Sequence, residues 1–256
     1  MYHIFDSVFC LNLRERKDRY DHSKQLFDRL SIPVEFLFAD KHPYSGSIGC
    51  FESHINAVKK AYNKGDHYVL IFEDDIVETT SFNDTVMTNI SEYLKTTNCE
   101  YFQLGYSILD MDEAVSFMKS SKHMVKNTCI IQYNGLLCHS YILNRNGMKR
   151  ILDHYEHANT THIDPFYKKL FKNKGASVCP LLFEQNFCMT SDYSKAENMY
   201  FTILRRLSCL QSKLSLFYVL SCIKRYSMYI WILLIILLLI KYKRYIWKSS
   251  GYCISY

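Results

Sequence analysis

The stretch "YVLIFEDDI" (residues 68–76) places three consecutive acids directly after a run of apolar residues. The apolar part is typical of a buried strand. Glu73, Asp74 and Asp75 would repel one another and lose hydration on packing, so a fold needs a compensating charge to hold them. A bound cation compensates most economically, and oxygen ligands suit Mg²⁺ or Mn²⁺. The stretch predicts a strand that ends at a metal site; the alternative is a solvated strand end with an acidic cap.

Strand-like and helix-like segments alternate around this stretch. We expect strands over residues 7–13, 34–40, 67–72, 100–105, 135–144 and 176–183, and helices over 14–30, 47–65, 82–96, 145–157 and 164–175. The second helix has Ser47 as a candidate N-cap and Gly65 as a candidate C-cap. Residues 106–128 are polar and irregular, which indicates a loop with a short helix. The alternation predicts an α/β fold with ligands at the carboxyl ends of the strands, where the acids stand.

The composition describes a globular protein in a reducing compartment. The chain has 256 residues, enough for one core of roughly 200 residues and an extra segment. Its 48% hydrophobic and 22% charged content excludes a disordered chain. The ten cysteines form no CxxC pair, so neither a zinc site nor a disulfide framework is readable, and the N-terminus lacks the pattern of a secretory signal.

The net charge of +6 is concentrated around one apolar segment near the C-terminus. This segment, residues 226–240, has fifteen residues. As a helix it would span roughly 22 Å, which is less than the ~30 Å hydrocarbon core of a bilayer. Basic residues on both sides favour a membrane surface as partner and not nucleic acid. We expect a globular domain over 1–200, a linker or amphipathic helix over 201–225, a membrane segment over 226–240 and a basic tail over 241–256. Whether the segment spans the membrane or lies in its interface stays open; either way we expect the globular domain in the cytosol.

Three motifs in this order and spacing resemble glycosyltransferase family 25. They are "CLNLRERKDRY" (10–20), "IGCFESHINAVKKA" (48–61) and the strand with its three acids. Later segments, "SYILNRNGMKRIL" (140–152), "HIDPF" (162–166) and "TSDYS" (190–194), are similar to further family elements, with departures at Asn144, Met148 and His162. The resemblance covers roughly residues 5–195. The family includes bacterial lipooligosaccharide β-galactosyltransferases and collagen hydroxylysine galactosyltransferases.

The resemblance implies a GT-A-like fold, with a Rossmann-like nucleotide-binding sheet, flanking helices and here an added C-terminal hydrophobic helix. It also implies transfer of a hexose, classically galactose, from a UDP-sugar to an acceptor hydroxyl, with inversion at the anomeric carbon. The acceptor would be a glycan or a glycoprotein that carries a hydroxylysine-type hydroxyl. In bacterial members this chemistry belongs to lipopolysaccharide biosynthesis. The implied cofactor is Mn²⁺ (or Mg²⁺) held by an Asp-x-Asp-like motif.

Inverting transfer needs a base for the acceptor hydroxyl and a countercharge for the departing diphosphate. The candidate metal ligands are Glu73, Asp74 and Asp75, with Asp192 as a late addition or an ordinary turn residue. Asp164 is the candidate base; the alternative is an N-cap before Pro165 at the first position of the helix.

The candidate donor-binding residues are polar groups on the first half of the chain: Asn12, Arg16, Arg19, Asp40, Ser53 and His54. Arginine pairs bidentately with phosphate oxygens, so Arg16 and Arg19 suit a diphosphate, although both could also lie on a solvated helix face. Asp40 suits uracil or ribose, or caps a loop. His54 is as consistent with a structural histidine as with a donor-site residue.

Two other functions fit parts of the pattern. One is a non-catalytic, membrane-anchored binder of sugar nucleotides or glycans with the same fold, which the three departures allow. The other is a metal-dependent nucleotidyltransferase, which also uses acids at strand ends. The absence of a Walker loop or a GxGxxG motif argues against a kinase or dehydrogenase.

Overall fold

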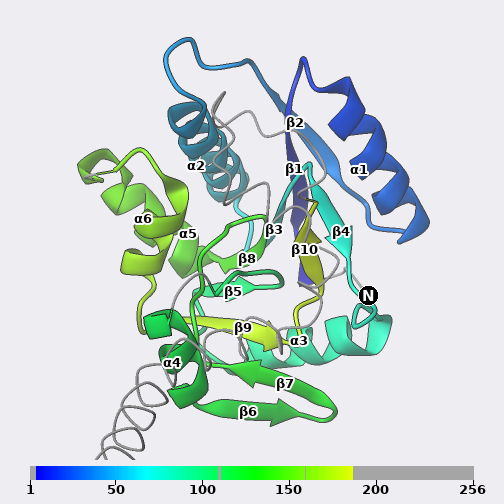
Figure 1. Cartoon of the computed structure of the whole chain (residues 1–256), viewed down its shortest axis with the longest axis vertical. Coiled ribbons are helices and arrows are strands. Elements are labelled where there is room, and N and C mark those ends of the chain that lie inside the picture. The colour runs from blue at the N-terminus through cyan, green and yellow to red at the C-terminus, as the bar shows by residue number, and fades with distance from the viewer. Residues whose placement is uncertain (1–3, 109–110, 159, 187–256) are drawn as a thin grey trace, which may run out of the picture.

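The computed structural model describes residues 4–108, 111–158 and 160–186. These residues form a mixed α/β fold around one eight-stranded sheet, with a separate two-stranded ribbon (Figure 1). The strands of the large sheet lie in the order β2-β1-β3-β8-β5-β9-β7-β6. Their bounds are β1 Ser7–Leu13, β2 Glu35–Ala39, β3 Tyr68–Glu73, β5 Tyr101–Gln103, β6 Lys122–Val125, β7 Thr128–Ile131, β8 Ser140–Asn144 and β9 Gly175–Cys179. The ribbon pairs β4 (Ile76–Glu78) with β10 (Phe183–Gln185).

Strands β1, β2, β3, β5 and β9 run in one direction, and β8 runs against its neighbours β3 and β5. Because of this reversal, the carboxyl end of β3 lies beside the beginning of β8, with Phe72 opposite Ser140. The amide of Glu73 donates to the carbonyl of His139 at 2.9 Å, just before β8. The turn that enters β8 is therefore part of the edge that carries the acids.

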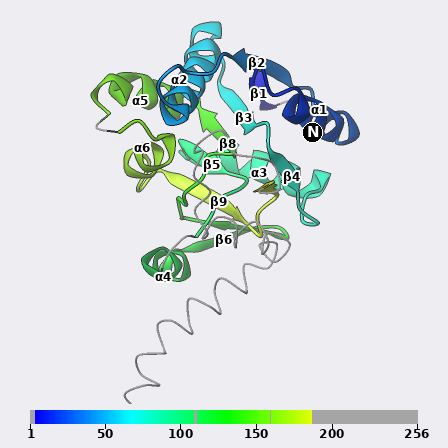
Figure 2. The same cartoon turned by 45° about the horizontal axis from the view of Figure 1, so that its top comes forward.

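Helices cover both faces of the sheet. The bounds are α1 Lys17–Arg29, α2 Gly46–Lys64, α3 Asp84–Thr96, α4 Met111–Lys119, α5 Arg145–His154 and α6 Ile163–Leu170, with a short 3₁₀ turn at Tyr155–His157. Figures 1 and 2 place α1 and α3 on one face and α2, α5 and α6 on the other. Within the part of the chain that the structure describes, none of these helices is long and apolar enough to cross a membrane.

The two faces of β3 enter two different cores. Leu70 and Phe72 pack in the core that contains residues of α1 and α3. Val69 and Ile71 pack in the core that contains residues of α2, α5 and α6. Successive side chains of a strand point to opposite faces, so Glu73, the last residue of β3, continues the face of Val69 and Ile71.

The expected elements are present, with corrections at their ends. The second helix begins at Gly46, and its N-cap is Ser45, whose hydroxyl accepts from the amide of Ser47 at 3.2 Å; Ser47 itself is not the cap. Gly65 is the C-cap, with the left-handed φ of 94° that glycine tolerates.

Two expectations in the second half of the chain were incomplete. The segment expected to be irregular, 106–128, contains α4 and strand β6. The β6–β7 hairpin begins after α4 and extends to Ile131. The last strand, expected over 176–183, is two strands, β9 and β10, separated at a cis Cys179–Pro180 bond. Residues 187–256 are not described, so the membrane segment 226–240 and its flanking regions stay predictions.

Gly147 fixes the contact between α5 and the loop before β5. A Cβ atom at this position would lie 2.1 Å from the carbonyl oxygen of Glu100, a backbone atom that no side-chain rotation can move. We expect Gly147→Ala to lower the free energy of unfolding by roughly 1–3 kcal/mol, the usual cost of overpacking. Asn146→Ala, at the exposed neighbouring position, is the control and should not destabilise the chain. Equal denaturant midpoints for the two variants would contradict the prediction.

Candidate active site

Asp74 and Asp75 are compensated by a guanidinium from α1. Arg19 Nη1 lies 2.8 Å from Asp74 Oδ1 and 3.1 Å from Asp75 Oδ2. The three side chains are 12%, 7% and 6% exposed, so this is a buried ion cluster and not a surface pair. Asn12 of β1 donates to Asp74 Oδ2 at 2.6 Å. The compensation that the acids require thus comes, in these contacts, from Arg19.

The β4–β10 ribbon holds Asp75 from the other side. Gln185 donates to Asp75 Oδ2 at 3.1 Å, and the amide of Asn186 donates to the Asp75 carbonyl. Two further buried oxygens, Asp75 Oδ1 and Asn12 Oδ1, have no hydrogen-bond partner among the residues that the structure describes. Buried oxygens without partners cost free energy, and a hard cation is a partner of the required chemistry. Asp74, Asp75 and Asn12 therefore fit a Mg²⁺ or Mn²⁺ ion.

Glu73 belongs to the opposite face of the sheet. Its Oε1 lies 3.2 Å from His54 Nε2, on the helix α2 that covers this face. The other ring nitrogen of His54 lies 2.8 Å from the hydroxyl of Tyr141, which is 3.5 Å from the hydroxyl of Tyr167 on α6. The three consecutive acids therefore divide between two polar groups. Asp74 and Asp75, with Arg19, form the group that faces α1. Glu73, with His54, belongs to the group that faces α2.

Asp164 lies in the group that faces α2. It is the second residue of α6, after Ile163, and the N-cap is His162, so its expected role as N-cap is wrong. Its carboxylate hydrogen-bonds with the thiol and the backbone of Cys138, just before β8. It is also close enough to Glu73 and His54 for its charge to act on their pKa values.

Burial is the largest influence on the pKa values of Glu73, Asp75 and His54. It raises the pKa of Glu73 to about 8, with Asp164 and Asp74 adding to the effect. It raises the pKa of Asp75 to about 6, because burial and the charge of Glu73 outweigh the attraction of Arg19. It lowers the pKa of His54 to about 4, so this imidazole is neutral at pH 7.

The sequence of this chain is similar to that of known glycosyltransferases. Residues 44–167 match the model of glycosyltransferase family 25 (LPS biosynthesis protein). This stretch, a little under half of the chain, is similar to members of that family. Procollagen galactosyltransferase 1-A of Xenopus laevis is 23% identical over 196 residues, which cover 65% of this chain and 31% of the relative. Procollagen galactosyltransferase 2 of Homo sapiens is 24% identical over 150 residues, covering 48% of this chain and 23% of the relative.

The chain thus spans a third or less of the length of these curated relatives. Among solved structures, A197 from STIV has a TM-score of 0.43 at 10% identity, covering 75% of this chain and 98% of its own. A glycosyltransferase involved in the glycosylation of the major capsid of PBCV-1 has a TM-score of 0.40 at 13% identity, covering 72% and 94%. Scores of this size do not define a shared topology.

The structure gathers only part of the expected donor-binding set at the three acids. Asn12, Arg19 and His54 each contact one of the three acids. Arg16 pairs with Asp18 at 2.7 Å.

The other two members have local partners. Asp40 pairs with Arg14 at 3.1 Å, and both side chains are exposed. The hydroxyl of Ser53 donates to the Gly49 carbonyl of its own helix at 2.7 Å. Asp192 lies outside the described residues.

Sequence analysis missed several members of the site. Gln185 and Tyr141 carry no local signal of their contacts with the acids and with His54, since those contacts arise from distant strands. Cys50, four residues before His54 on α2, was readable from helical spacing, because residues at i and i+4 share a face. The period of two along β3 separates Glu73 from Asp74, but it would place Asp75 with Glu73; the turn after Glu73 instead brings Asp75 to Arg19.

Removing the Arg19 guanidinium should destabilise the fold, because the repulsion between Asp74 and Asp75 would no longer be compensated. We expect Arg19→Met, measured in EDTA at pH 8, to lose about 3–5 kcal/mol of unfolding free energy, because two buried carboxylates are left uncompensated. The deficit should shrink as the pH falls and the carboxylates become protonated. Arg14→Met, in an exposed ion pair, is the control and should change little. A deficit that does not vary with pH would contradict this assignment.

The raised pKa of Glu73 predicts a pH-dependent stability. A carboxyl whose pKa is higher in the folded chain stabilises fully below its unfolded value, and that contribution is lost as the pH rises through the folded value. In EDTA, wild type should therefore lose stability between about pH 4.5 and 8, on the order of 5 kcal/mol. Glu73→Gln should flatten this part of the curve, whereas Glu52→Gln, exposed on α2, should not. Parallel curves for all three proteins would refute the prediction.

Proposed function

We propose that this chain is a glycosyltransferase that moves a hexose, with galactose as the first candidate, from a UDP-sugar to a hydroxyl of a glycan or of a hydroxylysine-type glycoprotein acceptor. The observation that carries the proposal is the buried Asp74–Asp75 pair at the carboxyl end of β3, within a family 25 sequence. The names of the curated relatives, both procollagen galactosyltransferases, support galactose as the sugar. A GT-A-like mode of nucleotide binding, inversion and dependence on Mn²⁺ (or Mg²⁺) belong to the same proposal.

The donor diphosphate would be held on the α1 side of the sheet. Asp74, Asp75 and Asn12 would hold the metal ion, which when bound neutralises charge on the departing diphosphate. Arg19 is the nearest protein cation in the described contacts, and its guanidinium is suited to phosphate oxygens. Because burial and acid–acid repulsion raise the pKa values of Asp74 and Asp75, a second cation would be favoured there.

The acceptor would be activated on the α2 side. Burial raises the pKa of Asp164, while hydrogen bonds with Cys138 oppose the shift. A carboxylate with a raised pKa is a stronger base toward a hydroxyl at neutral pH. Asp164 is partly exposed, so an acceptor hydroxyl can reach it. Its position on α6, across the strand end from Asp74, would place the base and the departing diphosphate on different sides of the sugar, as inversion requires.

The test is hydrolysis of UDP-sugars by the full chain in the absence of acceptor, with Mn²⁺ and with EDTA. We expect metal-dependent release of UDP from one sugar nucleotide. Asp75→Asn should reduce it at least about hundredfold, because several kcal/mol of charge stabilisation are lost. Asp21→Asn, exposed on α1, is the matched control and should retain activity.

Other outcomes point to the two alternative functions. Binding of a sugar nucleotide with no turnover, even with glycan or collagen-like acceptors present, would favour the non-catalytic binder. Formation of UTP from a UDP-sugar and pyrophosphate would favour a nucleotidyltransferase. Neither binding nor turnover by the folded chain would refute the donor site. Attachment to a membrane through residues 226–240, with the globular domain in the cytosol, remains a separate proposal from the sequence.

A further inference from the structure

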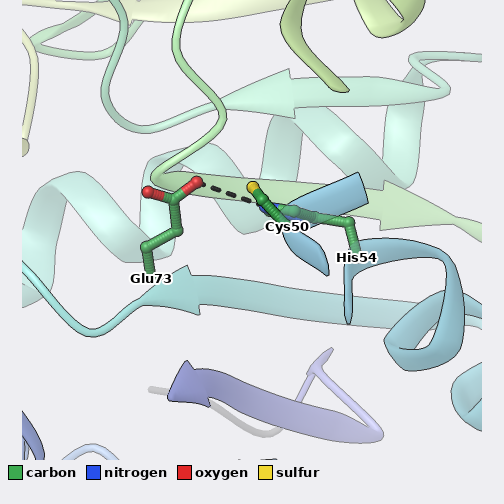
Figure 3. Close-up of side chains that lie close together, drawn as sticks. All are labelled: Cys50, His54 and Glu73. Atoms are coloured by element: carbon green, nitrogen blue, oxygen red, sulfur yellow. Dashed lines mark hydrogen bonds and ion pairs between the residues drawn. The ribbon is translucent and has the colours of Figure 1, made fainter. Parts of the chain in front are cut away.

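The group that faces α2 contains three different metal-binding atoms. The ligand atoms of Cys50, His54 and Glu73 all lie within 4.8 Å of one another. Figure 3 shows the three side chains close together, two of them from α2 and Glu73 from the end of β3. Cys50 and His54 stand at i and i+4, the spacing that puts two ligands on one helix face.

The separation of two of these atoms matches that of two ligands in a tetrahedral metal site. His54 Nε2 and Glu73 Oε1 are 3.2 Å apart. Two ligands that each bind Zn²⁺ at about 2.0–2.1 Å in tetrahedral geometry stand about 3.3 Å apart, so these two atoms need only small shifts to share an ion. The same distance also serves the hydrogen bond of the metal-free chain.

The surroundings orient the imidazole and supply negative charge. Tyr141, at 2.8 Å from Nδ1 of His54, fixes the ring so that Nε2 faces Glu73, as an outer partner does for a metal-bound histidine. The carboxylates of Glu73, Asp164 and Asp75 all act electrostatically on Cys50. A dication at this position would be attracted by all of them.

We propose that Cys50, His54 and Glu73 form a second metal site, distinct from Asp74 and Asp75, which takes a borderline transition metal such as Zn²⁺. The ligand set decides the metal class: sulfur, nitrogen and oxygen together suit Zn²⁺, whereas Mg²⁺ and Mn²⁺ prefer oxygen alone. The two sites are separated at the end of β3, because Glu73 contacts His54 of α2 whereas Asp74 and Asp75 in the following turn contact Arg19 of α1. With three protein ligands, a fourth position is open to water or to another group. The inference rests on these contacts and does not depend on the transferase activity.

Co²⁺ titration of the metal-free full chain tests the site, because a thiolate bound to Co²⁺ gives a charge-transfer band in the near ultraviolet. We expect about one equivalent of Co²⁺ to produce the band and Zn²⁺ to abolish it. Cys50→Ser should lose the band. Cys129→Ser, another partly buried cysteine on β7, should keep it. Tyr141→Phe should keep it but weaken Co²⁺ binding roughly tenfold or more, as expected for loss of an outer partner.

A measurement on wild type alone covers the case in which Cys50→Ser does not fold. The chain has ten cysteines, so alkylation by iodoacetamide is followed at the peptide that contains Cys50 by mass spectrometry. Zn²⁺ should slow modification of this peptide and leave that of the Cys129 peptide unchanged. Absence of a thiolate band in wild type, an unchanged band in folded Cys50→Ser, or no protection of Cys50 would each overturn the proposal.

Asp75→Asn separates this inference from the proposed function. It should abolish Mn²⁺-dependent turnover of the sugar nucleotide and leave the Co²⁺ band intact. Loss of the band together with turnover would show that the two groups form one site, which would also overturn the proposal.

Discussion

The edge of the sheet that carries the candidate site depends on one buried ion cluster. Arg19 binds Asp74 and Asp75 together, and all three side chains are largely shielded from water. Two buried carboxylates beside each other are strongly unfavourable, and removal of the cation would leave them without compensation. The contact also joins α1 to the end of β3, so the same interaction that stabilises the acids sets their position against the rest of the fold. Other contacts of the site, from Asn12 and Gln185, are built around it.

The end of β3 and the turn that follows it give the three acids two different roles. Glu73, the last residue of the strand, continues the face of Val69 and Ile71 toward α2, whereas Asp74 and Asp75 in the turn both meet Arg19 of α1. A single strand end thereby supplies an oxygen-rich group on one face and a mixed group with histidine and cysteine on the other. The reversed strand β8 completes the second group, since its direction brings the turn before Ser140 to the carboxyl end of β3.

Sequence patterns predicted the fold well wherever the signal was local. The strand at 7–13 and Gly65 as the cap of α2 agree with the structure, because backbone periodicity and a left-handed cap are properties of a few neighbouring residues. The β6–β7 hairpin was missed, since β6 is largely exposed and the buried β7 is only four residues long, so neither shows the apolar alternation that marks a strand. For the site, Asn12, Arg19 and His54 were found near the acids, whereas Asp40 faces solvent beside Arg14.

By itself the sequence determined that an apolar strand ends in three acids, that helices and strands alternate around it, and that its motifs resemble those of family 25. Only the tertiary structure decided which groups meet those acids. Arg19 stands 55 residues before Asp74, and Gln185 stands 110 residues after Asp75. Contacts over such separations follow from how helices pack on the sheet and from the direction of β8. Neither is encoded in a local period. The tertiary packing also sets the protonation, because burial raises the pKa of Glu73 and lowers that of His54.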